Sequence, residues 1–424
     1  MNNPFKNHID LSTSSFSMQS YPPKDKYWLH LLLFILTLLT TTLAGAELAT
    51  GRTMEQLNFF EDFSKGLPYS LAFLCFLTFH EFGHYFTAVY HGVRCSLPYY
   101  IPLYLPFSIF NIGSMGAVIR MRETPDSTRK YFDIGIAGPL SGFVISVILL
   151  AYGFSNLPDP DYLHGIHPEY KEWFGSQMPT DSQLQDALRS TGAVSIELGN
   201  SLIFQLFKYL FADPARLPGA MELYHYPFVF VGYLTLFFTA LNLLPIGQLD
   251  GGHVTYGLWG RKRAAIISRI TVFLLIGYGG IGWVDYETPE FMVYLGLYVL
   301  YVYYIITKIL GSDQAVNAFA LALCLVGLQY LLQTYTLLNS GGTLWLVYAF
   351  IAVRVIRLDH PPAFVEEPLN LKRKILGGIA ILIFILCFTP KPLEIVILEP
   401  PLPRDAPQET PAEDVLAGGV LIEQ

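Results

Sequence analysis

Long apolar runs separated by polar segments recur along this chain from residue 27 to residue 390. Most of them reach the roughly 20 residues that an α-helix needs to cross the hydrocarbon core of a bilayer. The pattern predicts an all-α polytopic membrane protein with about nine transmembrane helices, the last two of which are the shortest. The predicted spans cover residues 27–46, 67–92, 131–153, 226–246, 265–284, 291–310, 315–333, 343–357 and 375–390.

The composition agrees with this class of protein. Of the 424 residues, 52% are hydrophobic and only 14% are charged, and the mean hydropathy is +0.41. Soluble domains carry about 25% charged residues, so we expect the chain to be embedded in a lipid bilayer. The net charge of −8 and the lack of a Lys/Arg cluster exclude nucleic acid as an expected partner.

Charged residues in the connecting segments alternate in sign. Lys24 and Lys26 precede the first span, and the segment after it is acidic. Basic residues return around Arg120 and again, after the fourth span, around Arg261. Cytoplasmic loops are enriched in Lys and Arg, so the N-terminus is expected in the cytoplasm and nine spans would leave the C-terminus outside.

The second predicted span carries three ionisable residues within the motif HEFGH, at positions 80–84. On a helix, His80 and His84 are four residues apart and point in the same direction, as two ligands of one zinc ion must. Glu81 lies beside them without being a ligand and is placed to act as a general base for water. Because ionisable groups are costly to place in a bilayer, this cluster requires a functional reason.

A catalytic zinc ion usually takes three protein ligands, so the sequence should supply a third on another span. The fourth predicted span ends in NLLPIGQLDGGH (242–253), where Pro245 and Gly247 are expected to break the helix. Asp250 then falls near the cytoplasmic end. His80 lies roughly 20 Å into its own span at 1.5 Å per residue, which is a compatible depth. We therefore expect Asp250 to be the third ligand of one zinc ion per chain.

The segment between the second and third spans has a different pattern. Residues 98–121 are rich in aromatic and β-branched residues and contain a glycine-bearing turn, which is typical of a β-hairpin. Open strand edges are not tolerated in lipid. We therefore expect a membrane-associated β-hairpin after the second helix, facing protein or a polar cavity.

These motifs resemble the site-2 protease family, zinc metalloproteases that cut transmembrane substrates within the bilayer. The resemblance runs from about residue 70 to 260 and includes GSMGAVIRMRE (113–123) and GIAGPLSG (135–142) beside the two motifs above. The uninterrupted form of NLLPIGQLDGGH is similar to the cyanobacterial and chloroplast branch of the family, which lacks a PDZ domain.

The resemblance implies roles for five residues. His80, His84 and Asp250 would bind zinc, Glu81 would be the catalytic base, and Asn242 would help to hold the substrate or the developing oxyanion. It also implies single-pass membrane proteins as substrates, a hairpin that pairs with the extended substrate, and regulated intramembrane proteolysis. The expected location is a bacterial plasma membrane, with the active site towards the cytoplasm.

The chain divides into four parts on this interpretation. They are a cytoplasmic N-terminal segment (1–26), a catalytic membrane core (27–260), C-terminal transmembrane helices (261–390) and a disordered acidic tail (391–424). The core contains an extracytoplasmic insertion, 154–225, whose later part GNSLIFQLFKYLF (199–211) is typical of an amphipathic helix at a membrane surface.

Two other functions stay open at this stage. The protein could be a catalytically inactive membrane scaffold, or a metal-ion transporter, because transporters also carry buried His and Asp. Transporters are often built from inverted repeats, and the chain shows no internal repeat. Three further histidines, His91, His253 and His360, are interpreted as hydrogen-bonding residues rather than metal ligands.

Overall fold

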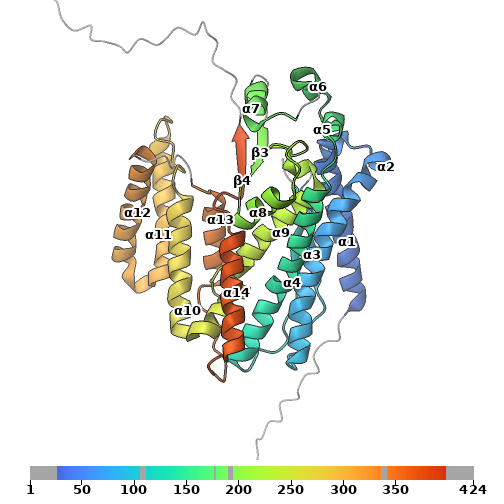
Figure 1. The fold of residues 1–424 in the computed structure, drawn as a ribbon. Coiled ribbons are helices and arrows are strands. Elements are labelled where there is room, and N and C mark those ends of the chain that lie inside the picture. Colours follow the sequence, from blue (N-terminus) through green and yellow to red (C-terminus); the bar gives the residue numbers. More distant parts are fainter. Residues whose placement is uncertain (1–25, 106–110, 176–177, 190–193, 336–340, 398–424) are drawn as a thin grey trace, which may run out of the picture.

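The computed structural model describes residues 26–105, 111–175, 178–189, 194–335 and 341–397. Over these residues the protein is mostly helical, and its long helices lie side by side (Figure 1). Helices occupy all nine of the predicted apolar segments. They are α1 (Tyr27–Thr50), α3 (Leu67–Tyr90), α4 (Thr128–Ser155), α9 (Pro227–Leu243), α10 (Asp250–Gly279), α11 (Phe291–Leu310), α12 (Ala315–Tyr335), α13 (Leu344–Ile351) and α14 (Leu371–Cys387).

Within the described residues, four helices are long and apolar enough to cross a membrane, namely α1, α4, α11 and α12 with the turn before it. The predicted count of nine spans is therefore not confirmed. Helices α9 and α14 have 17 residues each, which at 1.5 Å per residue gives roughly 26 Å, slightly less than the hydrocarbon core. Helix α3 carries the ionisable HEFGH motif, which lowers its hydropathy.

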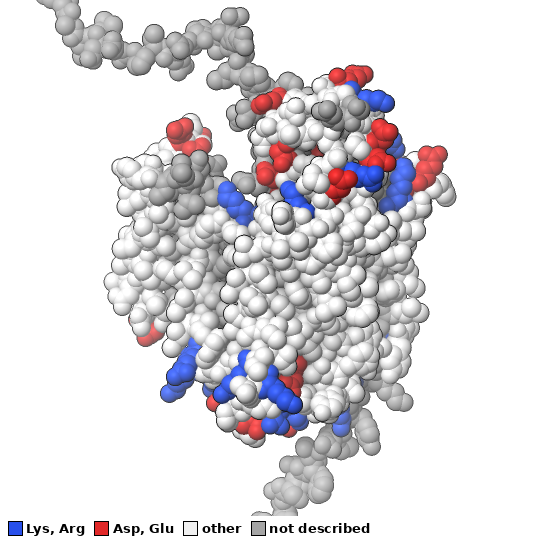
Figure 2. Space-filling model, in the orientation of Figure 1, with Lys and Arg blue, Asp and Glu red and all other residues white. Residues whose placement is uncertain are grey.

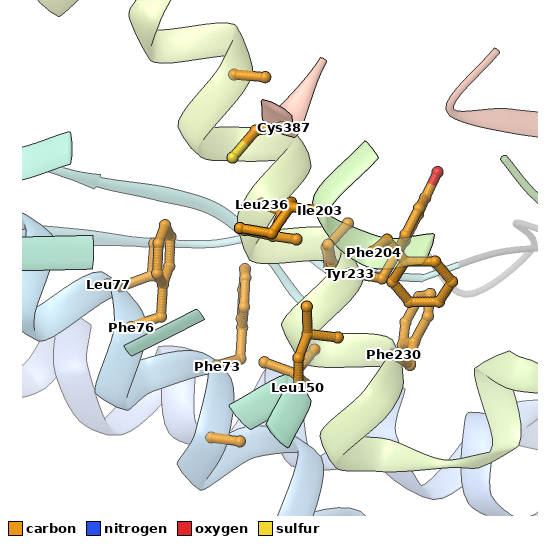
Figure 3. Close-up of a cluster of buried hydrophobic side chains, with 14 of the residues drawn as sticks. Phe73, Phe76, Leu77, Leu150, Ile203, Phe204, Phe230, Tyr233, Leu236 and Cys387 are labelled. Atoms are coloured by element: carbon orange, nitrogen blue, oxygen red, sulfur yellow. The ribbon is translucent and has the colours of Figure 1, made fainter. Parts of the chain in front are cut away.

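Large apolar side chains form the main core around α3, α4 and α9, and Figure 3 shows part of this cluster. Helix α14 joins this core although it comes more than a hundred residues later in the chain, because Ala380, Ile383 and Cys387 are buried where the helix packs on α9. The labelled side chains in this cluster are Phe73, Phe76, Leu77, Leu150, Ile203, Phe204, Phe230, Tyr233, Leu236 and Cys387.

A second apolar cluster joins α10, α11, α12 and α13 at the other side of the molecule. Helix α10 bends at Gly260, whose φ of 77° is outside the helical region. Only glycine adopts such a backbone conformation without strain. The kink falls at the predicted boundary between the membrane core and the C-terminal helices, so it divides α10 into one helical part on each side of that boundary.

The predicted hairpin is confirmed as an antiparallel pair, β1 (Tyr99–Pro102) with β2 (Ser114–Val118). Part of its turn, 106–110, lies outside the described residues. Among the described strands, β2 has β1 as its neighbour on one edge and none on the other. The second edge of β2 therefore has no strand paired with it among the described residues.

Hydrogen bonds hold the hairpin against α1 and α3. The Glu47 carboxylate of α1 accepts bonds from the Tyr104 hydroxyl (2.6 Å) and the Asn111 amide (3.0 Å). The Tyr69 hydroxyl of α3 donates to the Ile112 carbonyl (2.8 Å). Buried polar groups are costly unless they are paired, and here each pairing also fixes the hairpin in place.

The insertion after α4 is built of short elements. They are α5 (Asp161–Ile166), α6 (Pro168–Phe174), α7 (Asp181–Arg189), β3 (Val194–Leu198), α8 (Leu202–Phe211) and the 3-10 turn η3 (Leu223–His225). Helix α8 matches the amphipathic helix expected within 199–211, and its N-cap residue is Ser201, whose side chain accepts a bond from the Phe204 amide. Ser is a preferred residue at this capping position.

The tail expected to be disordered from residue 391 instead begins with an ordered strand. Residues Leu393–Ile397 form β4, which pairs antiparallel with β3 of the insertion. Residues 398–424, like 1–25, lie outside the described residues. The remaining short elements are η1 (Met54–Gln56), α2 (Phe59–Asp62), η2 (Phe63–Gly66), η4 (Ser312–Gln314) and the π-helical turn Ala352–Ile356.

Charged residues gather at the two ends of the molecule on the face drawn in Figure 2. Between these ends lies a broad belt in which the visible side chains are uncharged. Lys and Arg are numerous at the end where α4 and α14 begin, and both signs occur at the end formed by the insertion. This distribution suits helices that pass through a lipid bilayer, with charges outside the hydrocarbon region.

Candidate metal centre

His80 and His84 lie on one face of α3, in its second half. Both are buried, and their Nε2 atoms are 3.2 Å apart. The helical spacing of four residues brings the rings together without any distortion of the backbone. The helix therefore presents two imidazole nitrogens to a single point inside the protein.

Asp250 reaches the same point because the chain breaks between α9 and α10. Helix α9 ends at Leu243, the short segment containing Pro245 follows, and α10 begins at Asp250. In this segment Gly247 has a φ of 47°, and a Cβ there would lie 1.7 Å from the carbonyl oxygen of Arg357. The turn thus requires glycine at 247, as well as the proline that prevents the helix from continuing.

The Asp250 carboxylate lies against both imidazoles. Its Oδ2 atom is 3.5 Å from His80 Nε2 and 3.3 Å from His84 Nε2. Its side chain is 16% exposed, so the point where the three groups meet is accessible to water. A carboxylate in the first turn of a helix is also stabilised by the unpaired N–H groups there.

Two glycines after Asp250 allow this tight approach of α10 to the preceding segment. A Cβ on Gly251 would lie 2.1 Å from the Leu243 carbonyl oxygen, and one on Gly252 would lie 2.2 Å from that of Gly247. Backbone atoms cannot move aside as a flexible side chain can. The LDGG sequence is therefore explained by packing of the turn as well as by the carboxylate.

Helix α4 fixes the orientation of His84. The His84 Nδ1–H donates to the Ile134 carbonyl (2.7 Å), which leaves the Nε2 lone pair directed at the other two groups. On the next turn of α4, a Cβ on Gly138 would lie 2.0 Å from His84 Nε2. Only glycine leaves room for the ring at this position.

A cavity of 260 Å³ adjoins the three groups. Glu81 and Asn242 line it, and the Asn242 amide nitrogen is 3.3 Å from His80 Nε2. Glu81 is 6% exposed and points into the cavity from α3. The cavity thus places a carboxyl group and an amide beside the imidazole pair.

The end of the hairpin forms another wall of this cavity. Ala117, Val118 and Ile119 line it, and the backbone amide of Ile119 faces the Glu81 carboxyl group. Met115 and Val118 of β2 are 70% and 50% exposed. The strand therefore leads from an exposed apolar surface directly to Glu81.

The three groups fit a zinc ion. Tetrahedral zinc with ligand bonds of about 2.0–2.2 Å separates its ligand atoms by about 3.3–3.5 Å. The distances among His80 Nε2, His84 Nε2 and Asp250 Oδ2 are 3.2, 3.3 and 3.5 Å. Two imidazoles and one carboxylate are also a typical donor set for a catalytic zinc ion with one open position.

The other histidines near this region make hydrogen bonds. His91 Nε2 is 2.9 Å from Asp133, which also accepts two bonds from the Arg373 guanidinium at 2.7 and 2.6 Å. His253 Nδ1 is 2.6 Å from His360 Nε2. Burial lowers the pKa of His360 to about 4, so its ring is neutral at physiological pH.

Sequence reasoning missed two groups that position His84. It treated Gly138 as scaffold and assigned no role to the Ile134 carbonyl, although both contact the His84 ring. The signal was present in GIAGPLSG, a run of small residues of the kind that lets two helices approach closely. What it did not indicate is which residue of the neighbouring helix would occupy the space.

The part of the chain that matches known proteins contains the candidate metal centre. The model of Peptidase family M50 matches residues 68–278. A protein of Arabidopsis thaliana named "Probable zinc metalloprotease EGY1, chloroplastic" is 30% identical over 217 residues, which cover 51% of this chain and 34% of that protein. One of Oryza sativa subsp. indica named "Probable zinc metalloprotease EGY2, chloroplastic" is 27% identical over 241 residues, or 57% of this chain and 38% of that protein.

A third relative, "Probable zinc metallopeptidase EGY3, chloroplastic" of Arabidopsis thaliana, is 28% identical over 251 residues, or 58% of this chain and 39% of that protein. The matched regions thus span little more than a third of the length of these relatives. No solved structure matches the chain. All five residues of the candidate centre lie within the stretch matched by the family model, and through residues 68–278 the chain belongs to Peptidase family M50.

Proposed function

We propose that this protein is an intramembrane zinc endopeptidase that hydrolyses peptide bonds in or near transmembrane segments of membrane-anchored proteins. The observation that carries the proposal is the meeting of two imidazoles, one carboxylate and a separate carboxyl group at a cavity between apolar helices. Binding of the metal ion involves only the first three groups. The additional carboxyl group beside them is what hydrolysis requires.

His80, His84 and Asp250 are the proposed zinc ligands. Zinc, when bound, acts as a Lewis acid that polarises a carbonyl group and makes water acidic near neutral pH. The hydrogen bond from His84 to the Ile134 carbonyl holds that ligand in the required tautomer. The ligands are buried among α3, α4 and the start of α10, so protein rather than lipid surrounds the proposed zinc site.

Glu81 is the proposed general base. It accepts a proton from the attacking water and passes it to the leaving amine, the two proton transfers that amide hydrolysis needs. The Asn242 amide, 3.3 Å from His80 Nε2, is placed to donate a hydrogen bond to the carbonyl oxygen of the scissile bond as negative charge develops there.

The free edge of β2 is the proposed docking surface for the substrate backbone. A transmembrane helix satisfies its own backbone groups, so it must unwind before a peptide bond can be attacked. Strand addition replaces those lost hydrogen bonds and demands little of the side chains. Since Ile119 follows β2 directly and faces Glu81, a strand paired with β2 would bring its backbone to the base.

The proposed orientation places the basic loops and the N-terminus in the cytoplasm, following the positive-inside rule. His80 is the fourteenth of the 24 residues of α3, which puts it roughly 20 Å from the start of the helix and 15 Å from its end. Water would then enter from the nearer, basic side. The proposed location is a bacterial plasma membrane, which rests on the resemblance of NLLPIGQLDGGH to the cyanobacterial and chloroplast branch; the relatives named above are chloroplastic.

The decisive experiment is Glu81→Gln in the purified full-length chain, assayed in liposomes with a single-pass reporter peptide. Loss of a general base typically costs 10²–10⁴-fold in rate, so cleavage should fall by about that factor while zinc content is unchanged. Glu55→Gln, on an exposed turn, is the matched control and should cleave normally. Cleavage at the wild-type rate by the Glu81→Gln variant would refute the mechanism.

A further inference from the structure

A second group of two imidazoles and one carboxylate lies in the insertion, away from the centre described above. His167 comes from the turn between α5 and α6, and Glu222 and His225 come from the segment that leads into α9. His167 Nε2 is 3.2 Å from His225 Nε2. The Glu222 Oε2 atom is 3.7 Å from the first and 3.5 Å from the second of these nitrogens.

The hydrogen bonds on the far side of each ring fix where the protons are. His225 Nδ1 lies 2.5 Å from the Leu48 carbonyl at the end of α1, which can only accept, so this nitrogen carries the proton. His167 Nδ1 lies 3.1 Å from the Glu169 carboxylate, with the same consequence. Both Nε2 lone pairs then face each other, and this arrangement is repulsive unless a cation lies between them.

Glu222 adds a third electron-rich atom to the same point. It is 3% exposed, and its Oε1 atom accepts a hydrogen bond from the Tyr170 hydroxyl (2.8 Å). Its Oε2 atom is buried and makes no hydrogen bond within the described structure. A buried carboxylate oxygen without a donor is costly, and this one is directed at the two lone pairs.

The electrostatic surroundings favour a positive charge. Two further acidic residues, Asp181 and Glu169, lie close enough to Glu222 to add negative electrostatic potential at the point where the three groups meet. A single proton on Glu222 could satisfy one imidazole but not the other. A divalent ion satisfies both lone pairs and the carboxylate at once.

We propose that His167, Glu222 and His225 bind a second divalent metal ion of the zinc type, independent of the catalytic centre. Their mutual distances of 3.2, 3.5 and 3.7 Å are close to the roughly 3.3–3.5 Å expected between ligands of tetrahedral zinc. Nitrogen and oxygen donors of this kind suit zinc rather than calcium or magnesium. His167 is 22% exposed, so water can reach the remaining position.

The ion would act as a structural cross-link. Leu48 lies in the last turn of α1, and Gly51 caps the end of that helix. Gly51 lies beside both rings, since a Cβ added to it would be 3.5 Å from His225 and 3.8 Å from His167. His225 lies two residues before α9, the helix that carries Asn242. The metal would therefore join the α5–α6 turn to the segment before α9, with α1 linked through the hydrogen bond between His225 and the Leu48 carbonyl, and would hold the insertion on the membrane core.

The test counts zinc by elemental analysis of the purified full-length chain. We expect about two zinc ions in the wild type, about one in His167→Ala, about one in His80→Ala/His84→Ala and none in the triple variant. His164→Ala, a histidine of the same insertion outside the group, is the matched control and should keep both ions. The control also shows whether loss of a buried histidine alone disturbs the insertion.

A second measurement does not depend on total zinc content. In the His80→Ala/His84→Ala background, added zinc should raise the Tm, and the further change His225→Gln should remove this increase. The proposal is overturned if the wild type holds one zinc that His80→Ala/His84→Ala removes and His167→Ala does not. If instead His167→Ala removes the single zinc of the wild type and His80→Ala/His84→Ala does not, the second metal site is supported and the assignment of the catalytic centre is refuted.

Discussion

The two groups of imidazoles and carboxylate have nearly the same geometry and very different neighbours. In both, two Nε2 atoms are 3.2 Å apart with one carboxylate oxygen within 3.7 Å of each. The first group adjoins a cavity that contains Glu81, Asn242 and the end of a strand with a free edge. The second is enclosed by groups that only support the ligands, such as Tyr170 and the Leu48 carbonyl.

The comparison separates what binds a metal from what uses it. Convergent ligands with fixed tautomers are sufficient for binding. Hydrolysis also needs a base that is not a ligand and a surface that positions the substrate. Only the first group has both within the described structure, so matched changes at the two groups should have different consequences.

Removing the carboxylate from each group should give the largest contrast. We expect Asp250→Ala to lower cleavage by well over the ~100-fold that is typical for changes around a metal ligand, because a ligand itself is lost. Glu222→Ala should remove the other zinc ion and lower the Tm, while the zinc held by His80 and His84 stays. Reporter cleavage and zinc content are measured on both variants. Equal losses of cleavage would remove the distinction between the groups.

The sequence predicted the first group and not the second because of spacing. His80 and His84 are adjacent on one helix face, and the break at Pro245 and Gly247 indicated that Asp250 could turn inward. Glu222 and His225 also lie three residues apart, but at the N-cap and the last residue of a short 3-10 turn whose existence the sequence did not indicate. Their partner His167 is more than fifty residues away, across elements too short to show any periodicity.

For the fold as well, the sequence predicted local features and not contacts between distant segments. Apolar runs predicted the long helices to within a few residues because helical length and hydropathy are local properties of the sequence. The start of α10 at Asp250 was missed, since the polar segment that contains Arg261 and Gly260 looked like a loop. The pairing of β3 with β4 joins residues about two hundred positions apart, and no local pattern indicates such a partner.

The fixed position of His84 can be tested with a change that touches no ligand. We expect Gly138→Ala to displace the His84 ring, because the new Cβ would lie 2.0 Å from His84 Nε2. Helices α4 and α3 pack too closely for the ring to keep its position beside this Cβ. Changes beside a ligand typically cost 10–100-fold in metal affinity or activity, so zinc affinity and cleavage should fall by about that factor.

The matched control for this change is Gly378→Ala on α14, where nothing lies within 4 Å of the added Cβ. It should leave zinc affinity and cleavage as they are and stabilise the helix slightly, because alanine is a better helix former than glycine. If Gly138→Ala retains full zinc affinity, the close packing of α4 on His84 is not what fixes the ligand.

The smallest effect should come from Gly51→Ala, which approaches the second group as Gly138→Ala approaches the first. Gly51 has a φ of 66°, so any other residue there costs about 1–2 kcal/mol in unfolding free energy. Its Cβ would lie 3.5 Å from the His225 ring and 3.2 Å from Ile166, which allows contact without a severe clash.

Gly92→Ala is the matched control, with a φ of 70° and nothing within 4 Å. Both variants should lose similar stability in thermal unfolding, and only Gly51→Ala should weaken zinc binding at the second group. Equal zinc affinities in the two variants would mean that the end of α1 does not support this group, and that the insertion is held by other contacts.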